Sequence, residues 1–396
     1  MERIKLGVVG LGQRGYSMLR NFLSQPEVDI VAICDVYEDR VNAAYDRIMA
    51  LRENSSVTKY TDFEKFIHDA QINAIYVASS WEEHINQAIR AMEMHIPVGM
   101  EVGGAYSIKD CWRMVKTYEK TKTPIMLMEN CCYDRFELLA LSLARKGILG
   151  EIVHAHGAYS HDLRAEITGG NVNRHYRLRN YIARNCENYP THEFGPIAKI
   201  LNIGNGNNVL SVSSISSKAR GLHEYANDER CVDKSLKDTV FNQGDVVSTN
   251  IICENGETVT LTLNTTLPAY YSREFLIRGT KGFVNQETNS VVLDGKIAEY
   301  WEPRLSVAKY LNNADEFNEY LPDNWRTITD EERALGHGGM DYFMCRDFVT
   351  HLLSGEPMPI DVYDAAVWYA ITPLSAMSIA HGGKPYKMPN FAKNRK

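Results

Sequence analysis

Two side chains that can exchange protons, Tyr189 and His192, stand three residues apart in the segment CENYPTHEFGP, between two prolines. Residues at this spacing share one face of a helical turn, and Pro190 suits the first position of such a turn. A phenol has a pKa of about 10, so it exchanges protons near neutrality only if its surroundings lower that pKa or the histidine shares the proton. The same pattern is typical of a rigid corner that carries two rings, and the segment alone leaves both interpretations open.

The first residues of the chain predict a bound partner for such chemistry. The apolar strand IKLGVV runs into a G-x-G-x-x-G turn at Gly10, Gly12 and Gly15. In dinucleotide-binding folds these glycines allow the tight turn, the approach of a pyrophosphate and close helix–strand packing. A second strand, VDIVAICD, ends at Asp35, where a carboxylate binds the ribose hydroxyls and repels a 2′-phosphate. The segment therefore predicts NAD rather than NADP.

Short β-rich runs alternate with helical patterns up to residue 130, which predicts a doubly wound parallel sheet of the Rossmann type. Ligands in such sheets bind beyond the carboxyl ends of the strands. Polar and aromatic residues follow those ends, and Trp81 and His84 fit a buried aromatic and a helix-start histidine as well as a cofactor site. The residues at the later strand ends are Glu101, Val102 and Asn130.

The second part of the chain has a different pattern. Alternating runs such as EIVHAHGAYS and hairpin turns such as ENGE and GTKG predict a largely antiparallel sheet with one open face. We expect a mixed α/β plus α+β fold, with an NAD-binding domain at 1–130 and a substrate-binding and oligomerisation domain at 131–396. Its C-terminal helices, at 338–382, are expected to pack back, and the free sheet face is the candidate oligomer surface.

The composition excludes several classes of protein. The 396 residues are 44% hydrophobic and 23% charged, as in a folded protein of two domains. The formal charge of -7 is spread along the chain, so neither a nucleic-acid nor a membrane surface is predicted. No secretory pattern or long apolar segment is present, and the 8 cysteines show no CxxC spacing. We expect a cytoplasmic protein with reduced thiols.

Three histidines in the segment EIVHAHGAYSHD raise the question of a metal site. His154 and His156 share a face of an extended strand, whereas His161 and Asp162 follow beyond it and His161 points away. Because this spacing gives no complete ligand set, we predict no metal.

The organisation resembles the Gfo/Idh/MocA oxidoreductases. In that family a fifth strand ends in Glu-Lys-Pro, and a D-x-G-x-H-x-x-D motif supplies an aspartate and a histidine. This chain has MEVGG, with Val102 in the lysine position, and NYPTHEFG, with Asn188 for the first aspartate and Gly195 for the last. Only His192 remains of these groups. A valine cannot carry a proton, so the usual relay for the hydroxyl proton is missing.

The substitutions resemble one branch of that family, glycoside hydrolase family 109, the NAD-dependent glycosidases typified by α-N-acetylgalactosaminidases. The segments that carry the resemblance span most of the chain and include MEVGGAYSIKDCW, GAYSHDLR, NYPTHEFGP and GHGGMDYF. The usual family stretch N-G-N-L-Y-P-T-H-G reads N-C-E-N-Y-P-T-H-E here, which alters the approach to Tyr189.

The resemblance implies an unusual hydrolysis with a tightly bound NAD that is recycled in each turnover. NAD oxidises the C3 hydroxyl of the sugar, the C2 proton becomes acidic, the C1 substituent is eliminated, water adds, and the ketone is reduced again. No opposed pair of carboxylic acids is needed. We assign Tyr189 and His192 to proton transfer at C2 and at the C3 hydroxyl, and Tyr159 to sugar binding or leaving-group protonation.

The remaining site residues come from the same resemblance. Besides the three glycines, the positions implied for NAD are Gln13, Arg14, Asp35, Trp81, His84, Glu101, Val102, Asn130 and Tyr189. The positions implied for the sugar are Tyr159, Arg177, Tyr189, His192 and Tyr271. A solvated charge and a sheet aromatic are the plain alternatives for Arg177 and Tyr271.

Two other functions stay open at this point. One is a sugar or polyol dehydrogenase with net redox turnover, which would use His192 and Tyr189 as its relay. The other is a non-catalytic NAD-binding sensor. In each case the family suggests a homo-oligomer, either a dimer or a tetramer.

Overall fold

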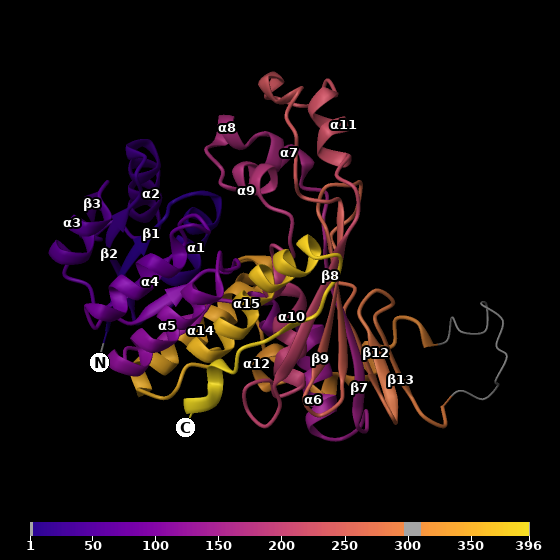
Figure 1. Ribbon diagram of the computed structural model, residues 1–396. Helices are drawn as coiled ribbons and strands as arrows, with labels where there is room; N and C mark the ends of the chain where they lie inside the picture. The colour runs from indigo at the N-terminus through magenta and orange to yellow at the C-terminus, as the bar shows by residue number, and fades with distance from the viewer. Residues whose placement is uncertain (1–2, 297–309, 396) are drawn as a thin grey trace. The chain divides into compact units, whose positions relative to one another are not determined.

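The computed structural model describes residues 3–296 and 310–395, and the chain forms two compact units. The first unit contains Met1–Tyr133 and Ile328–Ala366, and the second contains Asp134–Thr327 and Val367–Lys396 (Figure 1). Helix α15 (Val362–Ala380) contributes residues to both units. Across the described residues, the structure contains no helix of the length and apolar character that a bilayer crossing requires.

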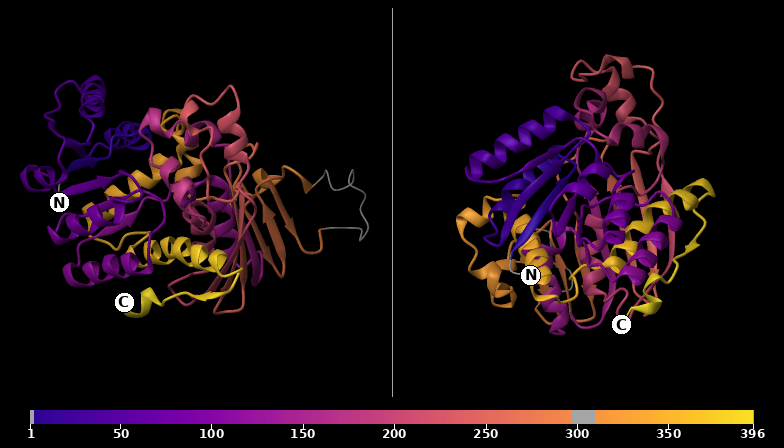
Figure 2. Two further views of the ribbon diagram at one scale, coloured as in Figure 1. Left: turned by 45° about the horizontal axis from the view of Figure 1, so that its top comes forward. Right: turned by 90° about the vertical axis from the view of Figure 1, so that its left-hand side faces the viewer.

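The first unit is built on a parallel sheet of six strands in the order β3-β2-β1-β4-β5-β6. The first strands of this sheet are drawn in indigo in Figure 2. This is the predicted doubly wound sheet, and the strand order reverses direction between β1 and β4, where such folds bind their ligands. The strands are apolar because helices cover both faces of such a sheet. Their bounds are β1 (Ile4–Val9), β2 (Val28–Cys34), β3 (Thr58–Tyr60), β4 (Ala74–Val77), β5 (Val98–Met100) and β6 (Ile125–Leu127).

Some helices of the first unit, such as α3 and α5, begin at a side-chain cap. The Asp62 carboxylate accepts the Lys65 N–H at the start of α3, and the Ser107 hydroxyl accepts the Asp110 N–H at the start of α5. The helical elements of the first unit are α1 (Gln13–Leu23), α2 (Glu38–Leu51), α3 (Phe63–Asp69), α4 (His84–Glu93), α5 (Ile108–Thr121), η1 (Asn130–Tyr133), α13 (Asp330–Arg333), η5 (His337–Gly339) and α14 (Met340–Ser354).

The second unit is built on an eight-stranded sheet in the order β13-β12-β11-β7-β10-β9-β8-β14. Every neighbouring pair is antiparallel except β7 and β10, which run parallel in the middle of the sheet. The predicted largely antiparallel sheet is therefore confirmed. The strands are β7 (Ile152–Ser160), β8 (Val209–Ser216), β9 (Val246–Cys253), β10 (Thr258–Asn264), β11 (Leu276–Gly279), β12 (Gly282–Asn285), β13 (Ser290–Leu293) and β14 (Tyr386–Lys387).

Helix α10 (Pro190–Ile200) packs against β7 and β10, and α6 (Arg135–Arg145) packs against α10 (Figure 1). Gly157 in β7 makes this contact close, since a Cβ there would lie 2.4 Å from the Glu193 carbonyl oxygen. The opposite face of the sheet is open to solvent, as the exposed Asn250 and Ile252 show.

Short helices lie beyond the end of the sheet at which β7 terminates (Figure 1). They are α7 (Arg164–Thr168), α8 (Gly170–Asn173), α9 (Arg177–Ala183), α11 (Gly221–Asn227) and η2 (Lys234–Leu236). The segment that follows the last hairpin contains η4 (Ala314–Tyr320) and α12 (Asp323–Arg326), and the chain ends with η6 (Phe391–Asn394).

Candidate active site

The glycine turn of the first unit has the geometry that a dinucleotide requires. Gly10 has a φ of +83°, and a Cβ there would lie 2.3 Å from the backbone nitrogen of Ser79. A Cβ on Gly15 would lie 1.8 Å from the Gly10 carbonyl oxygen. Both positions therefore require glycine, whereas a Cβ on Gly12, the N-cap of α1, would make only an ordinary contact with Arg40 at 3.6 Å. The N–H groups of the first helical turn have no intrahelical partner, and an anion satisfies them well.

The Asp35 carboxylate lies at the end of β2, buried and already partly engaged. It accepts the Leu11 N–H at 2.7 Å and the Tyr37 N–H at 3.0 Å, and the Arg40 guanidinium lies 3.9 Å away. An ionised carboxylate offers about four acceptor positions, so capacity remains for two ribose hydroxyls. Gln13 is exposed at the start of α1. These residues fit NAD.

Three predicted cofactor residues join one buried polar network in the first unit. Arg14 donates through Nε to Glu101 at 2.9 Å and through both Nη atoms to Asp341, each at 2.9 Å. The Tyr76 hydroxyl donates to Glu101 at 2.6 Å, and the Asn130 amide donates to Asp341 at 2.9 Å. Arg14 and Asp341 thus connect the glycine turn with the ends of β5 and β6.

Asp341 is a residue that the sequence analysis did not single out. It lies in the first turn of α14, almost fully buried, and its carboxylate also pairs with His337 Nδ1 at 2.7 Å. Burial alone would raise the pKa of Asp341, but the charges and hydrogen bonds of Arg14 and His337 lower it well below its ordinary value. The sequence did contain an indication of this site, since His337 and Asp341 belong to the segment GHGGMDYF, which carries part of the family resemblance.

Trp81 and His84 are both buried, and His84 begins α4. Its Nε2 pairs with the Ser79 carbonyl oxygen, and burial lowers the pKa of His84, which keeps the ring neutral. Gly103 lies against the indole, because a Cβ there would be 2.8 Å from Cδ1 of Trp81. Val102 is buried and donates its N–H to Glu101 Oε2 at 3.1 Å. Trp81 and His84 therefore match the alternative of a buried aromatic and a helix-start histidine. The roles of Trp81, His84 and Val102 in cofactor binding stay predictions.

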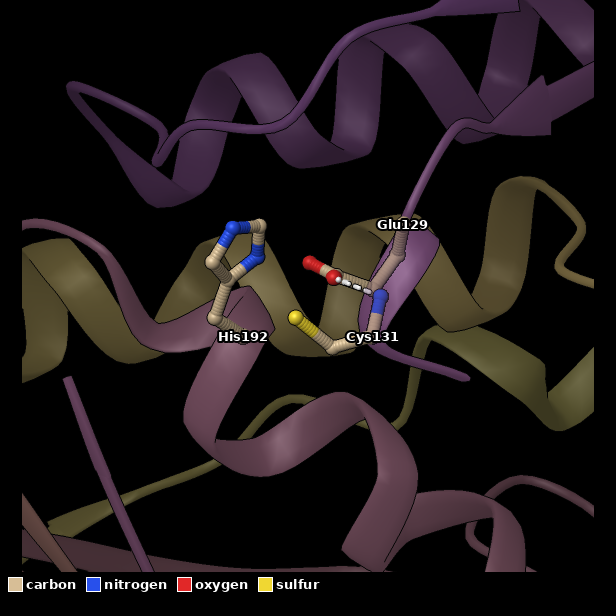
Figure 3. A group of neighbouring side chains, drawn as sticks. All are labelled: Glu129, Cys131 and His192. Atoms are coloured by element: carbon tan, nitrogen blue, oxygen red, sulfur yellow. Dashed lines mark hydrogen bonds between the residues drawn. The ribbon is translucent and has the colours of Figure 1, made fainter. Parts of the chain in front are cut away.

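Asn130 is held in place by a turn that closes on Glu129. The Cys131 N–H donates to Glu129 Oε1 at 2.9 Å where η1 begins (Figure 3). Cys131 Sγ also contacts the Asn130 side-chain oxygen at 3.7 Å. The Asn130 amide is thereby oriented toward Asp341.

The predicted catalytic residues of the second unit lie together. Tyr189 is the N-cap of α10, Pro190 is its first residue, and His192 lies in the first turn, where Figure 3 shows its ring projecting from the helix. The ring centres of Tyr189 and His192 are 4.7 Å apart. Tyr159, near the end of β7, has its ring centre 4.6 Å from Tyr189 and 5.5 Å from His192. Two phenols and one imidazole therefore form a compact cluster, which we call the aromatic cluster.

Arg177 provides a buried positive charge beside this cluster. Its guanidinium carbon lies 5.2 Å from the centre of the Tyr189 ring, and Nη1 donates to Glu166 at 2.7 Å. Burial alone would lower the pKa of Arg177, but Tyr159, Glu166 and Tyr189 are among the groups that raise it well above its ordinary value. The alternative of a solvated charge is wrong, because the residue is only 8% exposed.

Tyr271 lies at the edge of the aromatic cluster and is 45% exposed. Its ring centre is 6.3 Å from that of Tyr159, and its hydroxyl accepts a hydrogen bond from Arg273 at 3.0 Å. Arg273 is held by Glu137 at 2.6 Å and by Asp134 at 2.5 Å. Arg273 was not among the predicted site residues, and it fixes the position of the Tyr271 hydroxyl.

The three histidines of the β7 segment separate as the strand spacing predicts. His154 and His156 pair with Thr258 and Thr260 across the strands, at 2.9 and 2.7 Å. His161 instead lies 5.4 Å, ring centre to ring centre, from Tyr271, so it is a further neighbour of the aromatic cluster.

The backbone that precedes Tyr189 is clamped by a single glutamine. Gln243 accepts the Cys186 N–H at 3.3 Å and the Asn188 amide at 3.2 Å, and it donates to the Cys186 carbonyl oxygen at 3.0 Å. The Tyr181 hydroxyl pairs with Thr265 at 2.6 Å on the same buried side. This clamp limits the freedom of the loop that presents Tyr189.

Comparison with known protein families gives two matches that together span nearly the whole chain. Residues 133–396 match the family described as "Glycosyl hydrolase 109, C-terminal domain". Residues 4–128 match the family described as "Oxidoreductase family, NAD-binding Rossmann fold".

Individual relatives agree with these matches. The chain is 34% identical to a glycosyl hydrolase family 109 protein of Stenotrophomonas maltophilia strain K279a, over 98% of this chain and 89% of that protein. It is 33% identical to an α-N-acetylgalactosaminidase of Tannerella forsythia, over 99% of this chain and 87% of that protein. The solved structure of levoglucosan dehydrogenase with NADH and levoglucosan shares the fold, with a TM-score of 0.72 at 17% identity over 98% of this chain and 100% of the other.

Proposed function

The chain belongs to the glycosyl hydrolase 109 family and is an NAD-dependent glycosidase, and from that premise we propose that it cleaves N-acetylgalactosaminide-like glycosides while NAD stays bound and is recycled. The α-N-acetylgalactosaminidase among its relatives supports this choice of sugar. When bound, NAD supplies a hydride acceptor for the C3 carbon of the sugar and later returns the hydride.

The observation that carries the proposal is the aromatic cluster with the Arg177 charge beside it. Oxidation at C3 makes the C2 proton acidic, and a base must then remove it. The Tyr189 side chain, as a phenolate beside a guanidinium that stabilises its negative charge, serves as that base. His192, whose ring centre is 4.7 Å from that of Tyr189, takes the proton of the C3 hydroxyl. Tyr189 thereby stands in for the lysine and aspartate of the oxidoreductase pattern, whose histidine is retained as His192.

The other residues of the cluster bind the sugar and complete the proton balance. Tyr159 is positioned by β7 beside both partners, and we assign to it the proton that the departing oxygen at C1 requires. Tyr271, half-exposed and fixed by Arg273, presents its hydroxyl to the sugar. Water then adds at C1: its hydroxide bonds to C1, and its proton restores Tyr159. Tyr189 returns the proton to C2, and His192 returns the proton to the C3 oxygen when the ketone is reduced.

The decisive experiment uses the purified protein with no cofactor added. It is incubated with p-nitrophenyl N-acetyl-α-D-galactosaminide in deuterated water, and the released sugar is examined by mass spectrometry and NMR. We expect nitrophenol release with deuterium at C2, and loss of cleavage after borohydride reduction of the bound cofactor. Cleavage without C2 exchange would exclude the elimination route, and NADH formation without cleavage would indicate net dehydrogenase turnover. A panel of aryl glycosides then defines the preferred sugar.

A further inference from the structure

Two carboxylic acids, Glu187 and Glu193, are buried on either side of the Tyr189–His192 turn. Their exposed fractions are 0% and 1%. Both replace uncharged residues of the usual family stretch, which has asparagine and glycine at these positions. Two acids that depart from the pattern together, and meet in the interior, call for a physical explanation, because buried charges are costly unless they are paired.

The contacts of the pair connect it to Tyr189. Glu187 Oε1 accepts the Tyr189 N–H at 3.3 Å, and the Glu187 N–H donates to the Ser375 hydroxyl at 2.7 Å. The carboxyl groups of Glu187 and Glu193 are close enough for one to donate a hydrogen bond to the other once one of them carries a proton. The backbone of Thr262 is a further hydrogen-bond neighbour of Glu193, and within the described part of the chain no ordinary donor reaches the second oxygen of Glu187.

Two ionised carboxylates in this position would repel one another without water to screen them, so one proton must stay in the pair. Burial, and then the neighbouring charge of Glu187, raise the pKa of Glu193 well above its ordinary value. Burial also raises the pKa of Glu187 to about 7, although the hydrogen bond from Glu193 opposes this. The titratable groups that face the pair are Glu274, which acts on Glu193, and Cys186, which interacts with Glu187.

We infer that Glu187 and Glu193 act as one acid–carboxylate pair that positions Tyr189, with the Glu193 acid donating to the Glu187 carboxylate and that carboxylate accepting the Tyr189 N–H. A negative group at this place is also favoured by the N-terminal end of α10. The pair is a positioning device, since neither acid belongs to the aromatic cluster. The benefit of this pair for catalysis rests on the proposed function of Tyr189. The protonation of the pair does not depend on that function.

The protonation is tested by infrared spectroscopy on the full chain at mildly alkaline pH, above the pKa of Glu187. We expect the Glu193→Gln variant to lose the absorption of one buried carboxylic acid, since the amide then donates to an ionised Glu187. The Glu187→Gln variant should keep that absorption, because Glu193 stays neutral. Glu224→Gln, on an exposed position of α11, is the matched control and should leave the spectrum unchanged. Unchanged absorption in Glu193→Gln, or its loss in Glu187→Gln only, would overturn the assignment.

The positioning role is tested by kinetics on the aryl glycoside. The Glu187→Ala variant removes the acceptor of the Tyr189 N–H, and we expect kcat to fall on the order of 10- to 100-fold with little change in KM. The Glu187→Gln variant keeps a carbonyl acceptor and should recover most of the loss. Equal kcat values in the two variants would overturn the role. If the wild-type protein fails to cleave glycosides, the proposed function is wrong, but the infrared result still shows whether Glu187 and Glu193 share one proton. The infrared result is equally independent of whether the Glu187→Ala variant folds.

Discussion

The guanidinium carbon of Arg177 lies 5.2 Å from the centre of the Tyr189 ring while its Nη1 atom donates to Glu166 at 2.7 Å. The carboxylate fixes the orientation of the guanidinium, and the planar cation is left to face the phenol. An opposite charge at this range stabilises the ionised form of its neighbour. The proton transfer proposed for Tyr189 relies on this relationship.

Loss of that charge should slow the chemical step. For Arg177→Met we expect kcat to fall on the order of 100-fold, as when a preorganised electrostatic donor is removed. Arg179→Met changes an exposed arginine of the same helix and should retain activity. Initial rates with the aryl glycoside compare the two variants. Similar losses in both would indicate a general effect on α9 rather than an effect on the phenol.

Removal of the Tyr189 hydroxyl should abolish most of the activity and leave the fold intact. For Tyr189→Phe we expect a loss of kcat on the order of 100-fold or more, with C2 exchange lost in parallel. Tyr225→Phe alters a buried tyrosine of α11 and serves as the control. Full cleavage with normal C2 exchange in Tyr189→Phe would remove this residue from the scheme.

Neutralisation of Asp35 should relax the discrimination between cofactors. Its carboxylate disfavours a 2′-phosphate, so Asp35→Ser should weaken NAD binding and strengthen NADP binding, each on the order of tenfold. Titration of cofactor-depleted protein, followed by tryptophan fluorescence, measures both affinities. Asp46→Asn, on the exposed side of α2, is expected to bind both cofactors as the wild type does. An unchanged NAD/NADP ratio in Asp35→Ser would contradict the proposed ribose contact.

The stability of the protein should depend on Asp341 under acidic conditions. Because the folded state lowers the pKa of this group, its contribution is present above the ordinary aspartate pKa, about 3.9, and is lost as the pH falls below it. Asp341→Asn should therefore have a lower Tm near neutrality, and the difference from wild type should shrink on acidification. Thermal unfolding across the acidic range, with Asp46→Asn as the reference, measures the effect. A Tm difference between Asp341→Asn and the wild type that does not change with pH would refute this role of the Asp341 charge.

The features that depend on neighbouring residues could be predicted from the sequence. Gly10, Gly15 and Asp35 belong to one strand–turn–helix–strand pattern, and the structure shows why each type is required. The start of α10 at Pro190 follows from local chemistry as well. The aromatic cluster could be proposed because a family resemblance connects Tyr159 with the distant Tyr189, not because periodicity does.

The features that depend on long-range contacts could not be predicted in this way. Arg14 meets Asp341 across 327 positions of the sequence, and Arg273 meets Glu137 across 136 positions. No local periodicity indicates which charged residues will be buried together, because burial is decided by packing. Glu193 was visible only as a departure from a family stretch, and its effect depends on Glu187.

The parallel pairing of β7 with β10 sets a condition on how the second unit reaches its native state. Parallel neighbours require a crossover, and the crossover between these strands contains Arg177, Tyr189 and His192. Pairing of β7 with β10 therefore closes a long loop of chain that contains the reactive side chains. Because contacts between residues far apart in the sequence form slowly, we expect this central ladder to form late in the folding of the second unit.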